Sequence, residues 1–325
     1  MRTGENRKYT MEYLDKLSES KRRWLSIIIT GIISGLLTVW GIYGIGEYGM
    51  ALFILTPIFI GFGSTVFYGY KRKISRSEAI QIGYQCLGIF TLGLIACAIE
   101  GLICIVMAAP IGILFTWIGS LLGFTLIKKT PTSTPSALLI LLALIPLTSF
   151  VEKEIKPDLT SVTTSIIINA DPITVWKNVI EFPQLDEPTE FIFKTGIAYP
   201  INAKIDGSGI GSVRHCNFTT GSFVEPVTVW DEGKLLRFDV DEQPAPMKEL
   251  SFWNIDAPHL HDYFVSKKGQ FKLTKLQNGK TLLEGTTWYY HNIKPAIYWR
   301  QWSNLIIHKI HNRVLEHIKK NSEKK

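Results

Sequence analysis

Charged side chains on the apolar face of a predicted strand are the residues of this sequence that could do chemistry. In SVRHCNFTTGSFVEPVTVW, a turn at Thr220-Gly221 gives Arg214 and Glu225 one apolar face with Phe218 and Phe223. Because charge on such a face is costly unless paired, we expect Arg214 and Glu225 to be diagonal neighbours in a mostly buried pair. The pair could grip the polar end of an apolar ligand. The alternatives are a purely structural pair, or solvent exposure after a one-residue shift in register.

A second hairpin adds further candidate residues. In FKLTKLQNGKTLLEGTTWYYH, the Asn278-Gly279 pair is a strong signal for a two-residue turn, and this turn places Glu284 opposite Leu273 on the inward face. Acid–base catalysis by Glu225 or Glu284 is a minor alternative to ligand binding, and ordinary core packing is the alternative for the aromatic side chains. The candidate ligand-binding residues are Arg214, Glu225, Phe238, Glu284, Trp288, Tyr290 and Trp302.

Other chemistries lack support in the sequence. The sequence His259-Leu260-His261 would put two rings on one face of a strand, and His308 and His311 lie one helical turn apart. No Cys or carboxylate at ligand spacing completes either set, so we expect no metal. The stretch GSGIGS at 207–212 leads into a strand rather than a helix, which indicates a turn and not a phosphate loop. There is no GxSxG or Walker motif, so we assign no catalytic residue and no cofactor.

The first half of the chain is dominated by long uncharged runs. Four of these runs are long enough to cross a hydrocarbon core of about 30 Å as helices. The fifth is interrupted by Pro146, and an interfacial helix is the alternative there. We predict a membrane domain over 1–151 with about five helices, at 24–46, 48–70, 79–100, 108–127 and 135–151.

The net charge of +7 is concentrated in the membrane half. Residues 1–151 carry 13 Lys or Arg and 7 Asp or Glu, whereas residues 152–325 carry 22 and 21. The basic residues lie in the N-terminal segment and in alternate short loops, which is a topology signal rather than a nucleic-acid surface. We therefore expect an integral protein of a bacterial inner membrane with a cytoplasmic N-terminus. The C-terminal half is then extracytoplasmic with five spans and cytoplasmic with four.

One carboxylate interrupts the apolar run LIACAIEGLICIVMAAPIG. The run length places Glu100 at the end of the third span, and Pro110 suits the first turn of the fourth, so 100–109 is expected to be a short apolar connection. Glu100 could simply reach the interface at a hairpin tip. The alternative is a functional carboxylate that faces a cavity or the attached domain, because ionisable groups near membrane depth are often functional.

After a linker at 152–160, the pattern changes to strands and helices of a soluble domain at 161–325. A strand is predicted at 162–169, and Asp171 and Pro172 suit the N-cap and first position of the helix after it. The chain closes with a helix from near Pro295 to about Lys320, whose apolar stripe contains Trp299, Trp302, Ile306 and Ile310.

The two ends of this domain, TTSIIINADPITVWKNVIEF and GTTWYYHNIKPAIYWRQWSNLIIHKIHNRVLEHIKK, resemble the START-like (SRPBCC) superfamily. This superfamily includes polyketide cyclase/dehydrase and lipid transport proteins and the Bet v 1 helix-grip fold. The resemblance covers about 160–321 and implies a curved antiparallel sheet around a long C-terminal helix, with a hydrophobic cavity between them. The family has no universal catalytic residues to carry over.

Together these features predict a multi-domain chain, an all-α transmembrane domain followed by an α+β helix-grip domain. We expect a membrane-anchored, non-enzymatic protein that binds a lipid or other hydrophobic small molecule close to the bilayer. The alternatives are a ligand-responsive sensor or scaffold and a membrane-tethered enzyme of the cyclase type. The lipid bilayer and the hydrophobic ligand are the expected partners, and nucleic acid is not.

Overall fold

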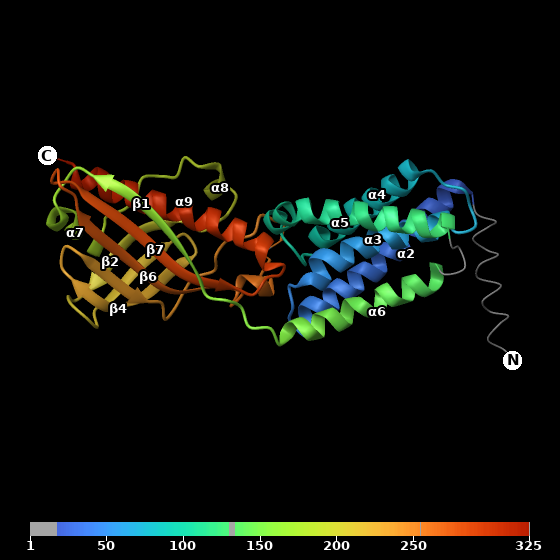
Figure 1. Cartoon of the computed structure of the whole chain (residues 1–325), viewed down its shortest axis with the longest axis horizontal. Coiled ribbons are helices and arrows are strands. Elements are labelled where there is room, and N and C mark those ends of the chain that lie inside the picture. Colours follow the sequence, from blue (N-terminus) through green and yellow to red (C-terminus); the bar gives the residue numbers. More distant parts are fainter. Residues whose placement is uncertain (1–17, 130–133, 254, 325) are drawn as a thin grey trace. The chain divides into compact units, whose positions relative to one another are not determined.

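The computed structural model describes residues 18–129, 134–253 and 255–324. Four residues of the basic N-terminal segment on which the topology prediction relies lie outside these ranges: Arg2, Arg7, Lys8 and Lys16. The chain divides into two compact units, of which one comprises residues up to 155 with 251–258, and the other comprises 156–250 with 259–325. The first unit is helical, and the second combines a sheet with helices (Figure 1).

The first unit contains five apolar helices that are long enough to cross a membrane. Their bounds are Glu19–Val39 (α2) continuing through Trp40–Ile45 (η1), Ala51–Leu55 (η2) continuing through Thr56–Gly69 (α3), Arg76–Ala96 (α4), Leu102–Lys129 (α5) and Thr134–Lys153 (α6). α3 lies at the centre of the unit and contacts α2, α4, α5 and α6. Successive helices run in opposite directions, so the loop after α3 and the end of α5 lie at the same end as the start of α2 (Figure 1).

Small residues bring the backbones of α3 and α5 close together. A Cβ atom at Gly61 would lie 2.1 Å from the carbonyl oxygen of Thr116, and one at Gly119 would lie 2.1 Å from that of Ile58. This close approach is typical of helix packing in membranes, where small residues take the place of a hydrophobic driving force.

The polar and apolar faces of α2 are reversed relative to a helix in a water-soluble protein. The polar side chains at four-residue spacing, Ser26, Thr30, Ser34 and Thr38, are buried in the unit, whereas Trp24, Ile28, Ile32 and Leu36 are exposed. An apolar exposed stripe with a hydroxyl-bearing buried stripe suits a helix surrounded by lipid.

The predicted apolar connection at 100–109 is wrong. α5 begins at Leu102, and Pro110 lies inside this helix instead of at its first turn. An apolar helix tolerates an internal proline when its surroundings satisfy the freed backbone groups. Glu100 lies in the turn between α4 and α5, as the run lengths indicated, and it is buried. Pro146 is likewise inside α6 rather than an interruption of it.

The second unit is built on one seven-stranded antiparallel sheet of order β1-β7-β6-β5-β4-β3-β2. The strand bounds are Thr160–Ile168 (β1), Pro200–Asp206 (β2), Val213–Phe218 (β3), Gly221–Asp231 (β4), Leu235–Asp239 (β5), Phe264–Lys275 (β6) and Thr281–His291 (β7). The helices are Pro172–Ile180 (α7), Phe191–Lys194 (α8), the short Pro258–Leu260 (η4) and Ala296–Ser322 (α9). The curved sheet and the long C-terminal helix confirm the predicted fold class of this unit.

Local sequence explains where the two longer helices begin. Asp171 is the N-cap of α7 and accepts hydrogen bonds from the backbone N–H groups of Ile173 and Thr174, and Pro172 occupies the first helical position. Pro295 is the N-cap of α9. The predicted starts of α7 and α9 are both confirmed. Such starts can be predicted because they depend mainly on local sequence.

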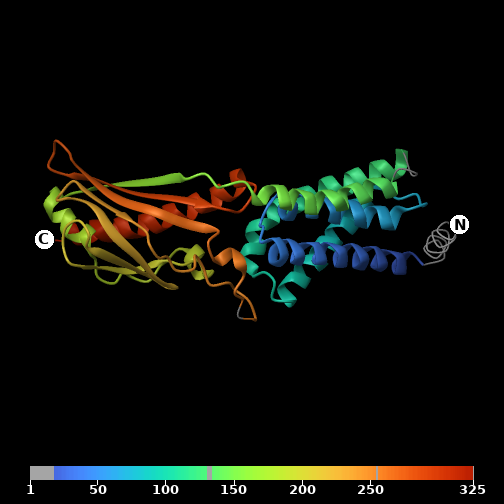
Figure 2. The ribbon, with the colours of Figure 1, turned by 90° about the horizontal axis from the view of Figure 1, so that it is seen from below.

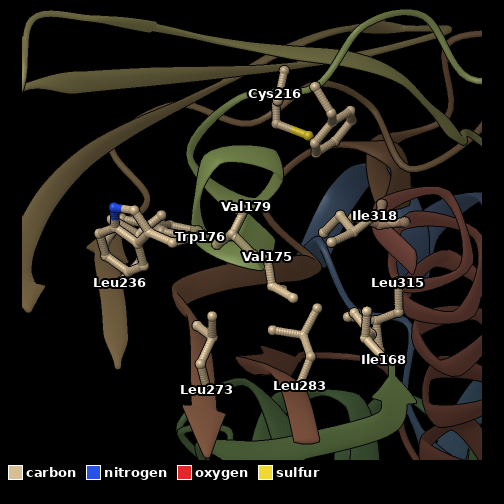
Figure 3. Packing of buried hydrophobic residues seen from close by; sticks show 14 of the residues in the cluster. Ile168, Val175, Trp176, Val179, Cys216, Leu236, Leu273, Leu283, Leu315 and Ile318 are labelled. Carbon is tan, nitrogen blue, oxygen red and sulfur yellow. The ribbon is translucent and has the colours of Figure 1, made fainter. Parts of the chain in front are cut away.

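α9 runs beside the strands and contacts β1, β7, β2 and α7 (Figures 1 and 2). Its buried side chains Leu315 and Ile318 meet Ile168 of β1 and the α7 residues Val175 and Val179 in one hydrophobic cluster (Figure 3). The cluster fills one end of the space between sheet and helix. Farther along α9, towards its start, the filling is incomplete and a cavity remains.

Candidate ligand-binding cavity

A cavity of about 120 Å³ lies between α9 and the strands of the second unit. Its walls are mainly apolar, and five phenylalanine rings contribute to them: Phe218, Phe223, Phe238, Phe264 and Phe271. An engineered apolar cavity of about 150 Å³ holds benzene. The space is therefore of the size of one small ring.

Arg214 and Glu225 both line this cavity. They lie directly opposite each other on β3 and β4, and a guanidinium Nη1 donates to the Glu225 carboxylate. The predicted buried pair is present, but its register is corrected. The turn lies at Thr219-Thr220 rather than Thr220-Gly221, and the resulting shift of two positions keeps both side chains on the inward face.

The positive partner is the more deeply enclosed of the two. The side chain of Arg214 is 2% exposed and that of Glu225 is 8% exposed. Arg214 Nε also donates to the carbonyl oxygen of Ile180 at 3.2 Å, and its guanidinium carbon lies 5.3 Å from the Phe238 ring centre and 5.6 Å from those of Phe182 and Phe271. These contacts compensate the loss of water around the guanidinium.

Burial and pairing oppose each other at this site. Burial raises the pKa of the Glu225 carboxyl, and the guanidinium of Arg214 partly opposes that shift. Burial, the largest single effect, lowers the pKa of Arg214, but the Glu225 carboxylate and the Cys216 side chain together outweigh it, so the pKa of Arg214 is raised and the group keeps its charge. The pKa of the neighbouring Cys216 thiol rises to about 12, mainly through burial, so the thiol stays protonated and unreactive.

His311 is the functional-site residue whose role sequence analysis missed. It lines the cavity from α9, and its Nε2 and Nδ1 lie 2.8 Å and 3.1 Å from the hydroxyls of Thr287 and Thr164. His308 Nδ1 shares the Thr164 hydroxyl at 2.7 Å. Burial, with a smaller effect from His308, lowers the pKa of His311 to about 4. The inward threonines could have been found from the strand alternation, given the right register.

The predicted register of the β6–β7 hairpin is wrong by one residue. The loop contains three residues, 277–279, with Gly279 at φ +76°, which is the pattern of a type I turn followed by a left-handed residue. Leu273 therefore pairs with Leu283, and Glu284 pairs with Lys272. The alternation of the strand then turns three predicted residues to the outer face, and none of them lines the cavity: Glu284, Trp288 and Tyr290.

The outer face explains the surroundings of these three side chains. Glu284 is 27% exposed and lies 3.5 Å from the Lys272 ammonium. The Lys267 ammonium lies over the Tyr290 ring, 5.6 Å from the ring centre. Trp302 of α9 is half-buried and also stands apart from the cavity lining. Among the sequence candidates, the structure thus brings together Arg214, Glu225 and Phe238.

Phe238 faces the cavity as predicted because two deviations from the predicted β4–β5 register cancel each other. The β4–β5 loop contains three residues, 232–234, instead of the predicted two. A bulge at Thr228 restores the predicted pairing of Val227 with Phe238. Between loop and bulge, Trp230 replaces Val229 opposite Leu236 and packs edge-on against Trp176 at 5.4 Å.

The histidine pair at 259 and 261 does not lie on a strand as predicted. Pro258–Leu260 forms a 3-10 helix, and His259 is buried with its Nε2 3.7 Å from a carboxylate oxygen of Glu249. The stretch at 207–212 forms the turn between β2 and β3, with Gly207, Gly209 and Gly211 all at positive φ. That turn was predicted.

The sequence matches no protein-family model and no curated protein. Solved structures similar to the second unit include norcoclaurine synthase from Thalictrum flavum, with 13% identity, a TM-score of 0.35, and coverage of 53% of this chain and 98% of that one. An aromatase/cyclase from Streptomyces sp. R1128 has 11% identity, a TM-score of 0.34, and coverage of 51% and 94%. A protein from Nitrosospira multiformis has 17% identity, a TM-score of 0.32, and coverage of 50% and 94%.

Proposed function

We propose that the second unit binds an apolar small molecule in the cavity between its sheet and α9, without chemical turnover. The observation that carries this proposal is an apolar, ring-lined space with one buried ion pair, Arg214 and Glu225, at its wall. Binding pockets commonly combine mostly apolar walls with a few fixed polar groups that orient the ligand.

The state of the titratable groups favours binding over catalysis. Both nitrogens of His311 have threonine hydroxyl partners, so the ring has no position left for a substrate proton. Glu225 is held by Arg214, and Cys216 stays protonated at physiological pH. General acid–base or nucleophilic chemistry needs a group that can exchange a proton near neutral pH.

We also propose that the five apolar helices anchor this unit in a membrane. The exposed apolar stripe of α2 and the glycine contacts between α3 and α5 support this. Only six residues, 154–159, separate α6 from β1 along the chain. A bacterial inner membrane, with the N-terminus in the cytoplasm and the binding unit outside it, is the topology that we propose.

Compounds that co-purify with the full chain provide the test. The full chain and the variant Gly285→Val would be purified in the same detergent, and extracted small molecules would be compared by mass spectrometry. Gly285 lines the cavity, and its added Cβ would lie 3.6 Å from Leu315 and 3.7 Å from Phe271, which are ordinary contacts, so valine adds volume at this wall and reduces the space for a ligand.

The expected result is a compound enriched with the native chain and depleted from the Gly285→Val variant, while both proteins unfold at similar temperatures. Identical extracts from two well-folded proteins, and no stabilisation of the native chain by any apolar additive, would argue against a cavity ligand.

A further inference from the structure

Within the ion pair that lines the cavity, the Glu225 carboxylate is more open than the Arg214 guanidinium. Arg214 is enclosed by three aromatic rings and the Ile180 carbonyl, whereas the Glu225 side chain keeps more of its surface open. A donor group on a ligand therefore reaches the Glu225 carboxylate more readily than the ligand reaches the guanidinium.

Glu225 has acceptor capacity that the described residues do not use. An ionised carboxylate offers about four lone-pair positions on two oxygens. In the described part of the chain, the hydrogen bond to this carboxylate comes from Arg214 and reaches Oε2. A buried acceptor without a donor is costly, so a ligand that supplies a hydroxyl or N–H group to the second oxygen gains affinity.

The charge balance of the cavity decides the charge of the ligand. Arg214 and Glu225 neutralise each other, so a charged ligand group of either sign would bring a net charge into the cavity. Lys268 also contributes to the lining, but its side chain is 53% exposed and its ammonium lies 3.9 Å from Asp239 outside. His311 is neutral at physiological pH. Any charged ligand group would therefore leave a net charge in a mainly apolar cavity, and its desolvation costs several kcal/mol.

We infer that the ligand is an uncharged, ring-sized molecule with a hydroxyl or comparable N–H donor that binds to Glu225, an inference that deepens the proposed function and rests on it. The volume of about 120 Å³ sets the size of the ligand, the phenylalanine rings favour an apolar ring, and the neutral pair excludes carboxylates and ammonium groups. An acyl chain with a charged headgroup satisfies none of these three conditions.

Four probes that share one ring test this inference: 4-fluorobenzyl alcohol, 4-fluorotoluene, 4-fluorobenzoate and 4-fluorobenzylamine. Their binding to the full chain in detergent micelles is measured at pH 7 by fluorine NMR. The Gly285→Val variant is measured in parallel, because its reduced cavity leaves mainly the partition of each probe into micelles. The double variant Arg214→Met with Glu225→Leu replaces both charges by apolar groups, which a protein core commonly tolerates.

After subtraction of the Gly285→Val control, the alcohol should bind at least about a hundredfold more tightly than either charged probe and several-fold more tightly than 4-fluorotoluene. The double variant should retain 4-fluorotoluene and lose the preference for the alcohol. The native chain alone already decides the charge question if the double variant fails to fold.

Two contrary outcomes have different meanings. If 4-fluorotoluene binds in the cavity but the alcohol has no advantage, or a charged probe binds as tightly, the inference is overturned while the proposed function stands. If no probe distinguishes the native chain from Gly285→Val, the cavity does not take ring-sized ligands, and the proposed function fails as well.

Discussion

At the residue scale, the two glutamates singled out in the sequence should differ sharply in their effect on stability. Glu225 shares a buried ion pair with Arg214, whereas Glu284 lies on the outer face beside Lys272. Arg214→Met leaves a buried carboxylate unpaired and should lower the free energy of unfolding by about 3–5 kcal/mol. Glu284→Gln, the matched control, should change it by about 1 kcal/mol or less. Urea unfolding of the full chain, followed by tryptophan fluorescence, measures both.

Equal effects of the two substitutions would contradict the burial assigned to the pair. The double variant Arg214→Met with Glu225→Leu separates the causes further, because it removes both charges together. It should recover most of the stability that Arg214→Met loses, since well-packed apolar residues often replace a buried ion pair at little cost.

His311 should make the stability of the second unit depend on pH. Its pKa falls from the ordinary 6.5 to about 4 in the folded protein, so the unfolded chain binds the proton more tightly. Stability is then complete above about pH 6.5 and decreases as the pH falls towards 4, by at most about 3 kcal/mol. His311→Gln should flatten this part of the profile, which thermal unfolding between pH 7 and pH 4 can measure. An unchanged acid slope in the variant would assign the dependence to another group.

At the element scale, the hairpins show which sequence signals determine a face and which do not. The β3–β4 prediction was wrong by two residues and still placed Arg214 and Glu225 inward, because side chains repeat every two positions along a strand. The β6–β7 prediction was wrong by one residue and turned Glu284 to the wrong face. Asn-Gly pairs occur in both two-residue turns and three-residue loops, so the Asn278-Gly279 pair did not distinguish the two registers of the β6–β7 hairpin.

The helices were easier to predict than the strands because their signals are longer. Runs of more than 20 uncharged residues located all five apolar helices, and Asp171-Pro172 located the start of α7. The predicted start of α5 is wrong because proline often marks the first turn of a helix, whereas Pro110 lies inside this apolar helix.

The contact between α3 and α5 should depend on Gly119. A side chain at this position would meet the Ile58 backbone, with its Cβ 2.1 Å from the carbonyl oxygen, so the two helices would have to separate. Gly119→Leu should destabilise the helical unit by about 1–3 kcal/mol or more. Gly112→Leu, on the same helix with open space around its Cβ position, is the matched control and should be well tolerated. Resistance to thermal aggregation in detergent compares the two, and equal behaviour would contradict the close packing.

At the scale of the whole molecule, the sequence predicted the two kinds of structure but not the content of the cavity. Hydropathy and the alternation of apolar and polar residues separate the helical half from the sheet. The same alternation correctly placed Arg214, Glu225 and Phe238 on the inward face, where they line the cavity. The involvement of His311 depends on contacts between α9, β1 and β7, which lie far apart in the sequence. Cavity size likewise depends on packing across several elements, which no local pattern encodes.

The last prediction concerns the side of the membrane on which the second unit lies. Five crossings would place the two ends of the helical unit on opposite sides. The loop after α3, which contains Lys71, Arg72 and Lys73, and the end of α5, which contains Lys128 and Lys129, lie at the end where α2 begins. Basic loops remain in the cytoplasm, so the unit after α6 should be outside it. Alkaline phosphatase, which is active outside the cytoplasm, should therefore be active when fused after Lys325. The same enzyme fused after Lys73, between α3 and α4, should be inactive and serves as the control. Activity of the Lys73 fusion together with inactivity of the Lys325 fusion would invert the topology, and inactivity of both would mean that α6 does not cross.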